Sequence, residues 1–431
     1  VECNPVYYAR KLYLGDELIT RVVLGDDVTE IKPYAFIGCE SLQEITFSRQ
    51  LTRIGALAFS YCTGLGHLQF PKSLTSIDDR AFSHCEKVGA LTLPGGLGSV
   101  CCSAFIDCTG IDTLIIEDAS QPLTVFTASA YPSGCVFEES PISYLYMGRD
   151  VVSGGKSKAA FSTQESLRKW VIAPGVSQLV AGDFQQCEDL DSVLIMDADE
   201  PLSGSSSWRF HPNSVQWAYV GRSLALPLMN GVESLDTVEF GARVREIGDY
   251  AFQGCTNLNH YDLPEGLVSI GSFAFSGCQQ RLRLTMPQTV TSVGTGAFQN
   301  TYIQEVHTPD IAAWSRINFG DITANPTSSG IKLYVNGQLF QGDFTLPESV
   351  EAVGRYAFCR YPYITSLTLP AGLTAVGDGA FLDCWSIRRL CVSGRDSGAL
   401  QVGEESFTGL GALDSVRLER DLMRFDAPFC R

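Results

Sequence analysis

The chain has 431 residues, of which 45% are hydrophobic and 18% are charged. This balance excludes an intrinsically disordered chain and indicates a large apolar core. The formal net charge is −17 at pH 7. Such an acidic surface repels phosphate groups, so we expect no binding of nucleic acid. By length alone, about three domains are expected.

We expect no insertion of this chain into a membrane, because no run of about 18 apolar residues occurs in it. Residues 1–10 lack the apolar stretch of a secretion signal. The chain does not begin with Met, so it is compatible with a longer precursor from which a secretion signal has been removed.

The dipeptide Ala-Phe recurs along the chain at intervals of 23 residues. It occurs at Ala35-Phe36, Ala58-Phe59, Ala81-Phe82 and Ala104-Phe105, then at Ala251-Phe252, Ala274-Phe275 and Ala297-Phe298, and again at Ala357-Phe358 and Ala380-Phe381. A fixed period of this length is typical of arrays of stacked repeats. The prediction of three domains is therefore replaced by one repeat array.

Each repeat is expected to contain one short strand. The repeat at 42–64 reads LQEITFSRQLTRIGALAFSYCTG, and its alternation turns Ile45 and Phe47 to one side and Glu44 and Thr46 to the other. In several repeats a proline follows and ends the strand. A second extended segment and a short turn or single helical turn at Ala-Phe complete the repeat. One repeat cannot bury a core alone, but stacked copies can.

Longer echoes show that blocks of repeats have been duplicated. They pair Ile115–Leu123 with Leu194–Leu202, Tyr144–Val151 with Trp217–Leu224, and Cys3–Ile19 with Ala324–Phe340, and a decayed copy includes Ser415–Leu422. Insertions interrupt the period near 115–140, 196–213 and 308–342. We therefore expect residues 1–431 to form a single solenoid of about 15–16 repeats. The final residues, 429–431, end within a repeat and form no obvious polar cap. Two explanations remain: an end-to-end contact with another molecule, or a shortened chain.

The repeat, with its A-F-x-x-C motif, resembles the BspA-like leucine-rich repeat family. Eight cysteines match the last motif position: Cys39, Cys62, Cys85, Cys108, Cys187, Cys255, Cys278 and Cys384. Thr301 and Tyr361 replace the cysteine in two repeats, and Met229 replaces the phenylalanine in one. The resemblance implies a right-handed curved α/β solenoid with a parallel sheet on the concave face and short turns or single helical turns opposite. It also implies export to a bacterial or protist surface, and adhesion or host-protein binding.

The fifteen cysteines are best explained as packing residues. At one per repeat, their side chains form a buried column in which each thiol is a weak donor to a turn carbonyl. Neighbouring thiols would lie about 4.8 Å apart, so occasional disulfides stay open. No C-x-x-C is present to indicate zinc, and the segment 197–200 is more typical of a solvated loop than of a calcium site.

No catalytic or cofactor-binding motif emerges. The five histidines lie in different repeats, and Gly154–Ser157 (GGKS) is interpreted as an insertion loop because Asp150 stands where a phosphate-binding loop needs its first glycine. We expect no cofactor, no metal and no enzymatic activity. For Arg149 and Arg222, which follow duplicated strands, we expect a shared structural role, such as donation to turn carbonyls between repeats, rather than a catalytic one.

The outward strand positions predict a binding patch. Its candidate residues are Tyr144, Tyr146, Lys169, Trp217 and Tyr219. Val171 and Leu194 would form an apolar floor between two aromatic pairs about 14 Å apart. The alternative is that these aromatic side chains are structural and are covered by the insertion between Phe105 and Phe137.

These observations predict a secreted or surface-exposed binding module that engages a host or neighbouring-cell protein through the concave sheet. Two alternatives stay open: a glycan-binding surface protein that stacks sugars on the aromatic pairs, and a structural spacer for another domain.

Overall fold

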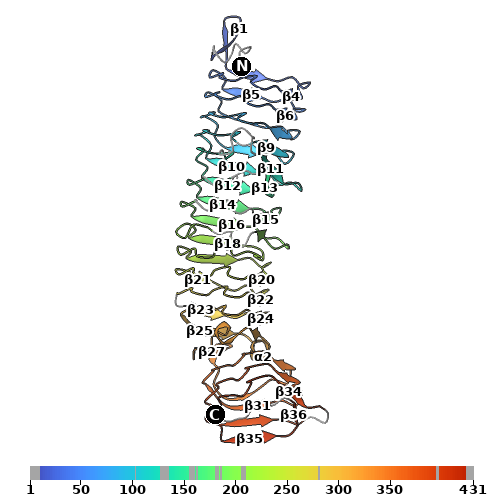
Figure 1. The fold of residues 1–431 in the computed structure, drawn as a ribbon, viewed down its shortest axis with the longest axis vertical. Coiled ribbons are helices and arrows are strands. Elements are labelled where there is room, and N and C mark those ends of the chain that lie inside the picture. The colour runs from blue at the N-terminus through green and yellow to red at the C-terminus, as the bar shows by residue number, and fades with distance from the viewer. Residues whose placement is uncertain are drawn as a thin grey trace. The chain divides into compact units, whose positions relative to one another are not determined.

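The computed structural model describes residues 10–101, 103–126, 135–154, 161, 164–179, 184, 187–204, 210–279, 282–394 and 398–423 (Figure 1). The chain divides into two compact units, Val1–Tyr219 and Val220–Arg431, which are described separately.

The first unit is built from parallel strands. One sheet contains β8 (Leu91–Leu93), β10 (Thr113–Ile116), β12 (Tyr144–Met147), β14 (Lys169–Ile172), β16 (Ser192–Ile195) and β18 (Trp217–Val220), whose last residue begins the second unit. A second sheet contains β4 (Glu30–Ile31), β6 (Arg53–Ile54), β7 (Ser76–Ile77), β9 (Ser99–Cys101), β11 (Leu123–Phe126) and β13 (Val151–Gly154). Two further parallel pairs are β3 (Arg21–Val23) with β5 (Glu44–Thr46), and β15 (Gln178–Leu179) with β17 (Ser203–Gly204). An antiparallel hairpin joins β1 (Leu12–Leu14) to β2 (Glu17–Ile19).

The second unit repeats this plan. β19 (Thr237–Phe240) pairs with β21 (His260–Tyr261). A four-stranded sheet contains β20 (Glu246–Ile247), β22 (Ser269–Ile270), β24 (Ser292–Val293) and β26 (Asn318–Phe319). Another four-stranded sheet contains β23 (Leu282–Thr285), β25 (Ile303–Thr308), β27 (Lys332–Val335) and β28 (Gln338–Leu339). The others contain β29 (Gly342–Thr345), β31 (Ile364–Leu369), β33 (Arg389–Val392) and β35 (Ser415–Leu418); and β30 (Ala352–Val353), β32 (Ala375–Val376), β34 (Leu400–Val402) and β36 (Leu422–Met423). A short helix, α2 (Ile311–Ser315), and a 3-10 turn, η1 (Ile322–Ala324), lie in the predicted insertion.

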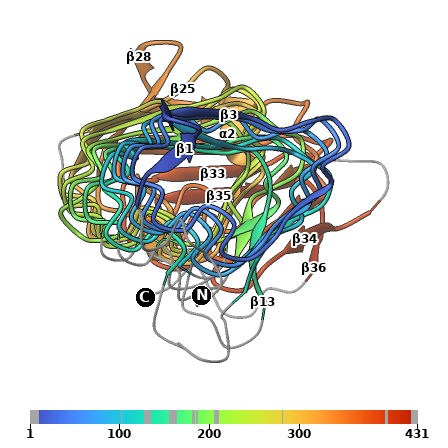
Figure 2. The same ribbon diagram turned by 90° about the horizontal axis from the view of Figure 1, so that it is seen from above.

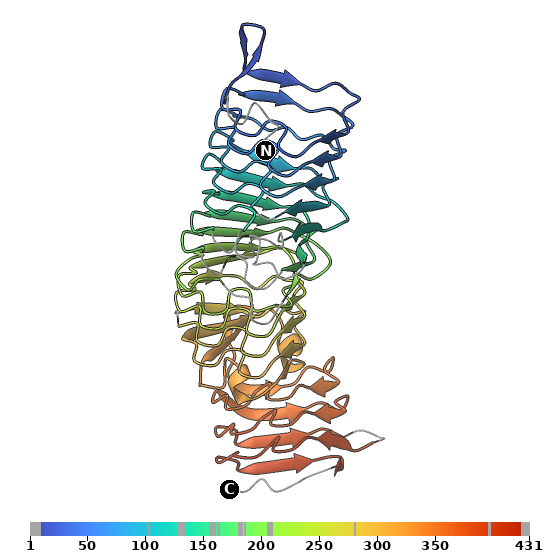
Figure 3. The ribbon, with the colours of Figure 1, turned by 45° about the horizontal axis from the view of Figure 1, so that its top comes forward.

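The predicted fold class is confirmed as a solenoid of parallel strands, with about 16 turns and almost no helix. In each unit the strands of successive coils lie side by side (Figure 3). Most coils place one strand in a sheet and a second short strand in another sheet, and in several coils a proline lies at the turn between them. Inward residues of the first strand, such as Ile45, are buried, and Glu44 and Thr46 beside it are exposed.

The phenylalanines of the Ala-Phe motif form a continuous stack in the first unit. Ring centroids of neighbours are 5.1 Å apart for Phe36–Phe59 and 5.3 Å for Phe82–Phe105, with nearly parallel planes. The insertion near 115–140 does not interrupt the stack, because Phe105 and Phe137 lie 5.5 Å apart at an interplanar angle of 11°. Burial of aromatic rings dominates core energetics, so this column is the spine of the unit.

The Ala-Phe segment is a left-handed turn and not the helical turn that the spacing allowed. The residue before Ala and the residue before Cys both have positive φ, as at Leu57 (57°) and Tyr61 (62°). Between them, the Phe59 N–H donates to the Ala81 carbonyl of the next coil at 2.7 Å. The turn thus bonds to its neighbour coil, which a helix bonded within itself could not do.

Candidate binding face

The strand register brings the five predicted patch residues onto one face of the first unit. Tyr144 pairs with Lys169 and Tyr146 with Val171 across β12 and β14, and Lys169 and Val171 pair in turn with Ser192 and Leu194 on β16. On β18, the Trp217 N–H donates to the Asp191 carbonyl, which places Trp217 and Tyr219 on the next strand of the same sheet. We call Tyr144, Tyr146, Lys169, Val171, Leu194, Trp217 and Tyr219 the binding face.

The two tyrosines that lie farther along their strands each donate to an aspartate. Tyr146 Oη donates to Asp118 at 3.2 and 3.3 Å, and Tyr219 Oη donates to Asp197 at 3.1 and 3.0 Å. Partial burial raises the pKa of Tyr146, and the negative charge of Asp118 raises it further. The sequence pattern did not reveal these pairs, although both aspartates occupy the same place in the duplicated segments. They fix the rings while leaving both carboxylates exposed.

The floor between the aromatic pairs is apolar. Val171 is 6% exposed and Leu194 is half-buried, while Lys169 is exposed beside them. All four aromatic side chains are half-buried, so each presents part of its ring to solvent. The covering alternative concerned the loop before Phe137, and residues 127–134 of that loop lie outside the described residues.

Arg149 anchors the turn behind the binding face. Its Nη1 and Nη2 donate to the carbonyls of Gly95 and Pro94, both at 2.9 Å, and the residue is 1% exposed. Burial lowers the pKa of the guanidinium, and the charge of Glu117 partly offsets this effect. The predicted role, donation to turn carbonyls of other coils, is confirmed for Arg149.

The same arrangement occurs in the second unit. Arg222 is fully buried. Arg420 donates to the carbonyls of Ala371 and Leu373, at 3.2 and 2.7 Å. Sequence reasoning missed Arg420, although the decayed copy at Ser415–Leu422 contained the signal.

The cysteine column has the predicted packing role. Cys62 Sγ donates to the Phe36 carbonyl at 3.1 Å, and Cys85 and Cys108 donate in the same way to the coils before them. Burial raises the pKa of Cys108 to about 12, so the thiol stays protonated at neutral pH. The cysteines of the described residues are free thiols.

Where the cysteine is missing in the first unit, another donor takes its place. Ser140 Oγ donates to the Phe105 carbonyl at 2.8 Å, and Gln164 Nε2 donates to the Phe137 carbonyl at 2.7 Å. In the second unit, Thr301 bonds instead to the Phe298 carbonyl of its own turn. The position therefore accepts other donors than a thiol, and in two repeats of the second unit it holds an apolar residue, Val232 or Leu410, instead.

A polar cluster that the sequence did not reveal lies on β23, β25 and β27. Arg283 Nη2 lies 3.2 Å from His307 Nδ1, and Glu305 lies 3.1 Å from His307 Nε2, while the imidazole stacks on Tyr334 at 4.7 Å. Because arginine only donates, Nδ1 accepts and the Nε2–H donates to Glu305. Both ring nitrogens are thus engaged in structural bonds. A cavity of about 590 Å³ lies beside Arg283 and His260.

The described part of the chain contains no group of three or more His, Cys, Asp or Glu side chains that could hold a metal ion. Nor does it contain a helix with the length and apolar character needed to cross a membrane.

Comparison with known proteins identifies the repeat. Residues 10–133, 228–319 and 335–428 match the family model described as BspA type leucine rich repeat region, in six copies. A leucine rich cell surface protein from Faecalibacterium prausnitzii is 22% identical, with a TM-score of 0.30, over 72% of this chain and 88% of that chain. A leucine-rich repeat protein from Bacteroides ovatus is 20% identical, with a TM-score of 0.29, over 92% of this chain and 86% of that chain. A search of curated proteins found no match.

Proposed function

Because the chain belongs to the BspA-type leucine-rich repeat family, we propose that it is a non-enzymatic binding module, secreted or exposed on a cell surface. It engages a protein of a host or neighbouring cell through the binding face. A repeat array suits this work because it presents a long surface that loses little conformational entropy on binding.

The pair of tyrosine–aspartate contacts is the observation that carries this proposal. Tyr146 and Tyr219 are held by Asp118 and Asp197, so their rings are already ordered before a partner arrives. Ordered aromatic side chains around an apolar floor are typical of the residues that dominate protein–protein affinity. The exposed Lys169 adds one positive charge at the centre of this face.

The test is binding of the purified chain to a panel of purified extracellular-matrix and cell-surface proteins. We expect Trp217→Ala and the double variant Tyr146→Ala/Tyr219→Ala each to weaken capture of a panel protein at least about tenfold, as hot-spot residues do. Tyr61→Ala is the matched control, since Tyr61 is an exposed tyrosine of the first unit that lies on a turn against His84. Unchanged capture by the face variants would contradict the proposal.

A glycan is the second candidate ligand, because each pair joins an aromatic ring to an exposed carboxylate. Rings stack on the apolar face of a sugar, and carboxylates accept its hydroxyl protons. A glycan array separates the two candidates. Retention of a neutral oligosaccharide, lost in Tyr146→Ala/Tyr219→Ala, would favour the glycan over the protein ligand.

A further inference from the structure

Gln164 brings an oxygen atom to a position where the repeat uses only a donor. Its Nε2 donates to the Phe137 carbonyl at 2.7 Å, which is the bond that the Cys62 thiol makes to Phe36. Because the Phe137 carbonyl can only accept, the amide nitrogen faces it and Oε1 is turned away from it. The residue is 2% exposed, and no group in the described part of the chain donates to Oε1. A buried acceptor of this kind is satisfied by a water molecule or an ion.

The coil that precedes Gln164 is one residue shorter at the same turn. The N–H groups of Ile111 and Leu167, in the coils on either side, each donate to a carbonyl three residues earlier. The Ile142 N–H of the coil between them donates to Ser140, two residues earlier. All three donors are buried just before a strand of the same sheet, so the missing residue belongs to the turn. Since the coils of the first unit, blue to green in Figure 2, lie over one another, the short turn leaves a space between its longer neighbours.

A cavity of about 340 Å³ lies at this short turn. Gln164 lines it together with two acidic residues, Glu139 and Glu165, and two hydroxyl residues, Thr109 and Ser166. Both glutamates are exposed. Among the described residues, no lysine, arginine or histidine lines the cavity. Its wall therefore offers oxygen atoms and negative charge, without a cationic side chain to balance that charge.

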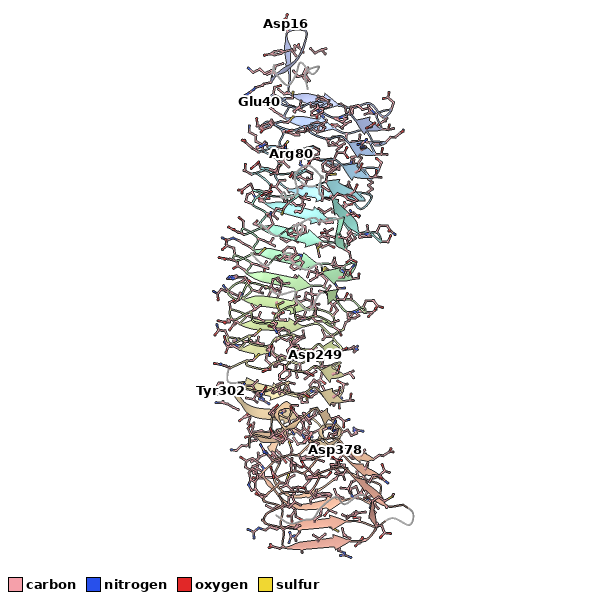
Figure 4. All side chains as sticks on the ribbon, viewed as in Figure 1. Asp16, Glu40, Arg80, Asp249, Tyr302 and Asp378 are labelled. Atoms are coloured by element: carbon pink, nitrogen blue, oxygen red, sulfur yellow. The ribbon has the colours of Figure 1, made fainter. Side chains whose placement is uncertain are left out.

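Acidic residues also occur at this turn in other coils, outside the cavity. Glu40, Glu86 and Glu188 hold the position of Glu165 in their own repeats. All three are exposed, and Glu40 can be seen on the outside of the fold in Figure 4. They supply matched controls, because their carboxylates share the repeat position of Glu165 but do not line the cavity.

The groups that line the cavity form a donor set that suits calcium. Ca²⁺ takes about six to eight oxygen ligands from carboxylates, amide carbonyls and water, and it tolerates irregular geometry. Mg²⁺ demands a nearly octahedral site and releases its waters reluctantly, and the softer transition metals prefer nitrogen or sulfur ligands. One water molecule needs roughly 15 Å³ of such space, so the cavity admits an ion together with several waters.

We propose that this cavity binds one calcium ion, with the Glu139 and Glu165 carboxylates and Gln164 Oε1 as its protein ligands. The two carboxylates balance the charge of the ion, and water supplies the remaining ligands. The net charge of −17 favours the approach of cations to the chain. Glu139 and Glu165 belong to neighbouring coils, so the ion links these coils where the turn is shortened. The site does not include the binding face and does not depend on its ligand.

Calorimetric titration of the calcium-free full chain with CaCl2 tests the site. In about 0.15 M NaCl, which screens the general attraction of cations to an acidic surface, we expect one site with a Kd of about 0.1–1 mM. MgCl2 should bind at least about tenfold more weakly. A chain that takes up no calcium at concentrations up to about 10 mM would overturn the proposal, because a water molecule alone would then satisfy Gln164.

A pair of double variants locates the ion. Glu139→Gln/Glu165→Gln removes both charges from the cavity and should weaken calcium binding at least about tenfold. The control, Glu86→Gln/Glu188→Gln, removes the same charge from exposed positions outside the cavity and should leave the Kd within about twofold of the wild-type value. Equal weakening by the two variants would assign the ion to the general acidic surface and would overturn the site.

Gln164→Cys separates the amide oxygen from the structural bond. A thiol restores the donor that Cys62 and Cys85 provide in their own coils, but it brings no oxygen. We expect the circular dichroism of this variant to match the wild-type chain, and its calcium affinity to fall at least about fivefold. Wild-type affinity in the folded variant would exclude Gln164 as a ligand and overturn the proposal. The glutamate variants decide the question independently of this substitution, since both glutamates are exposed.

Discussion

The Arg149 guanidinium donates at 2.9 Å to the carbonyl of Gly95, a residue 54 positions earlier in the chain. A single side chain therefore bonds to a turn more than one repeat away and satisfies carbonyls that no strand partner reaches.

Replacing this side chain should lower the stability of the first unit. In Arg149→Met the Gly95 carbonyl loses its donor inside the protein, while the Pro94 carbonyl keeps only the Leu97 N–H, so we expect a cost of about 1–3 kcal/mol in the free energy of unfolding. Urea unfolding followed by circular dichroism measures this difference. Arg168→Met, which removes an exposed arginine of the same unit, is the control and should change little. Equal effects of the two substitutions would argue against the anchoring role.

The cysteine column should tolerate a hydroxyl better than an apolar side chain. Cys85→Ser keeps a donor for the Phe59 carbonyl, as Ser140 does naturally for Phe105. Cys85→Val has no donor and leaves the Phe59 carbonyl with only the Cys62 N–H, so we expect it to destabilise the fold by about 0.5–1.5 kcal/mol. Cys85→Ser should cost less, and chemical unfolding of both variants compares them. A valine variant as stable as the serine variant would show that packing alone decides this position.

The buried thiols should make the fold sensitive to alkaline pH. Burial raises the pKa of Cys108 and of Cys278 to about 12, from the ordinary value of 9.0. The folded chain then holds these protons more tightly than the unfolded chain. Their contribution to stability is complete below about pH 9 and is lost as the pH rises toward 12, by up to about 1.4 kcal/mol per pH unit for each thiol. Unfolding measured from pH 7 to about pH 10.5 should show a shallower decline in Cys108→Ser/Cys278→Ser than in the wild-type chain.

Glycine is required before Arg149. A Cβ at Gly148 would lie 2.5 Å from the Asp118 nitrogen and 2.6 Å from the Ile116 carbonyl oxygen. Gly148→Ala must shift this backbone, so we expect a loss of about 1–3 kcal/mol. Gly89→Ala is the control, because no atom lies within 4 Å of its added Cβ. Thermal unfolding compares the two, and similar midpoints would contradict the close approach.

The repeat period was sufficient to predict one short strand in each repeat, the burial of Ile45 and the cysteine column, whereas the parallel sheet was implied by the family resemblance and the role of Arg149 by the duplicated segments. Each of these depends on one position of the repeat and on the same position in its neighbours, so stacking copies determines it. The predicted patch residues do share one face, because Tyr144 and Lys169 occupy the same phase on neighbouring strands. Whether that face binds a ligand stays a prediction.

Contacts that cross the period were beyond sequence reasoning. Tyr146 meets Asp118 through a loop whose path the repeat does not specify, and Arg283 meets His307 because two strands shift register between Leu282 and Arg283. The left-handed turn was missed for another reason. Leu57 and Tyr61 are residue types that seldom adopt positive φ, so their conformation is imposed by bonds to the next coil.

The unbroken ring stack between Phe105 and Phe137 has an evolutionary consequence. Thirty-two residues separate these two phenylalanines instead of 23, yet the rings meet as they do elsewhere. Additional residues can thus be inserted at the edge of a coil while the stacked phenylalanine rings keep their spacing. A lineage carrying this fold can lengthen or exchange its surface loops, and so change what it recognises, without selecting a new core each time.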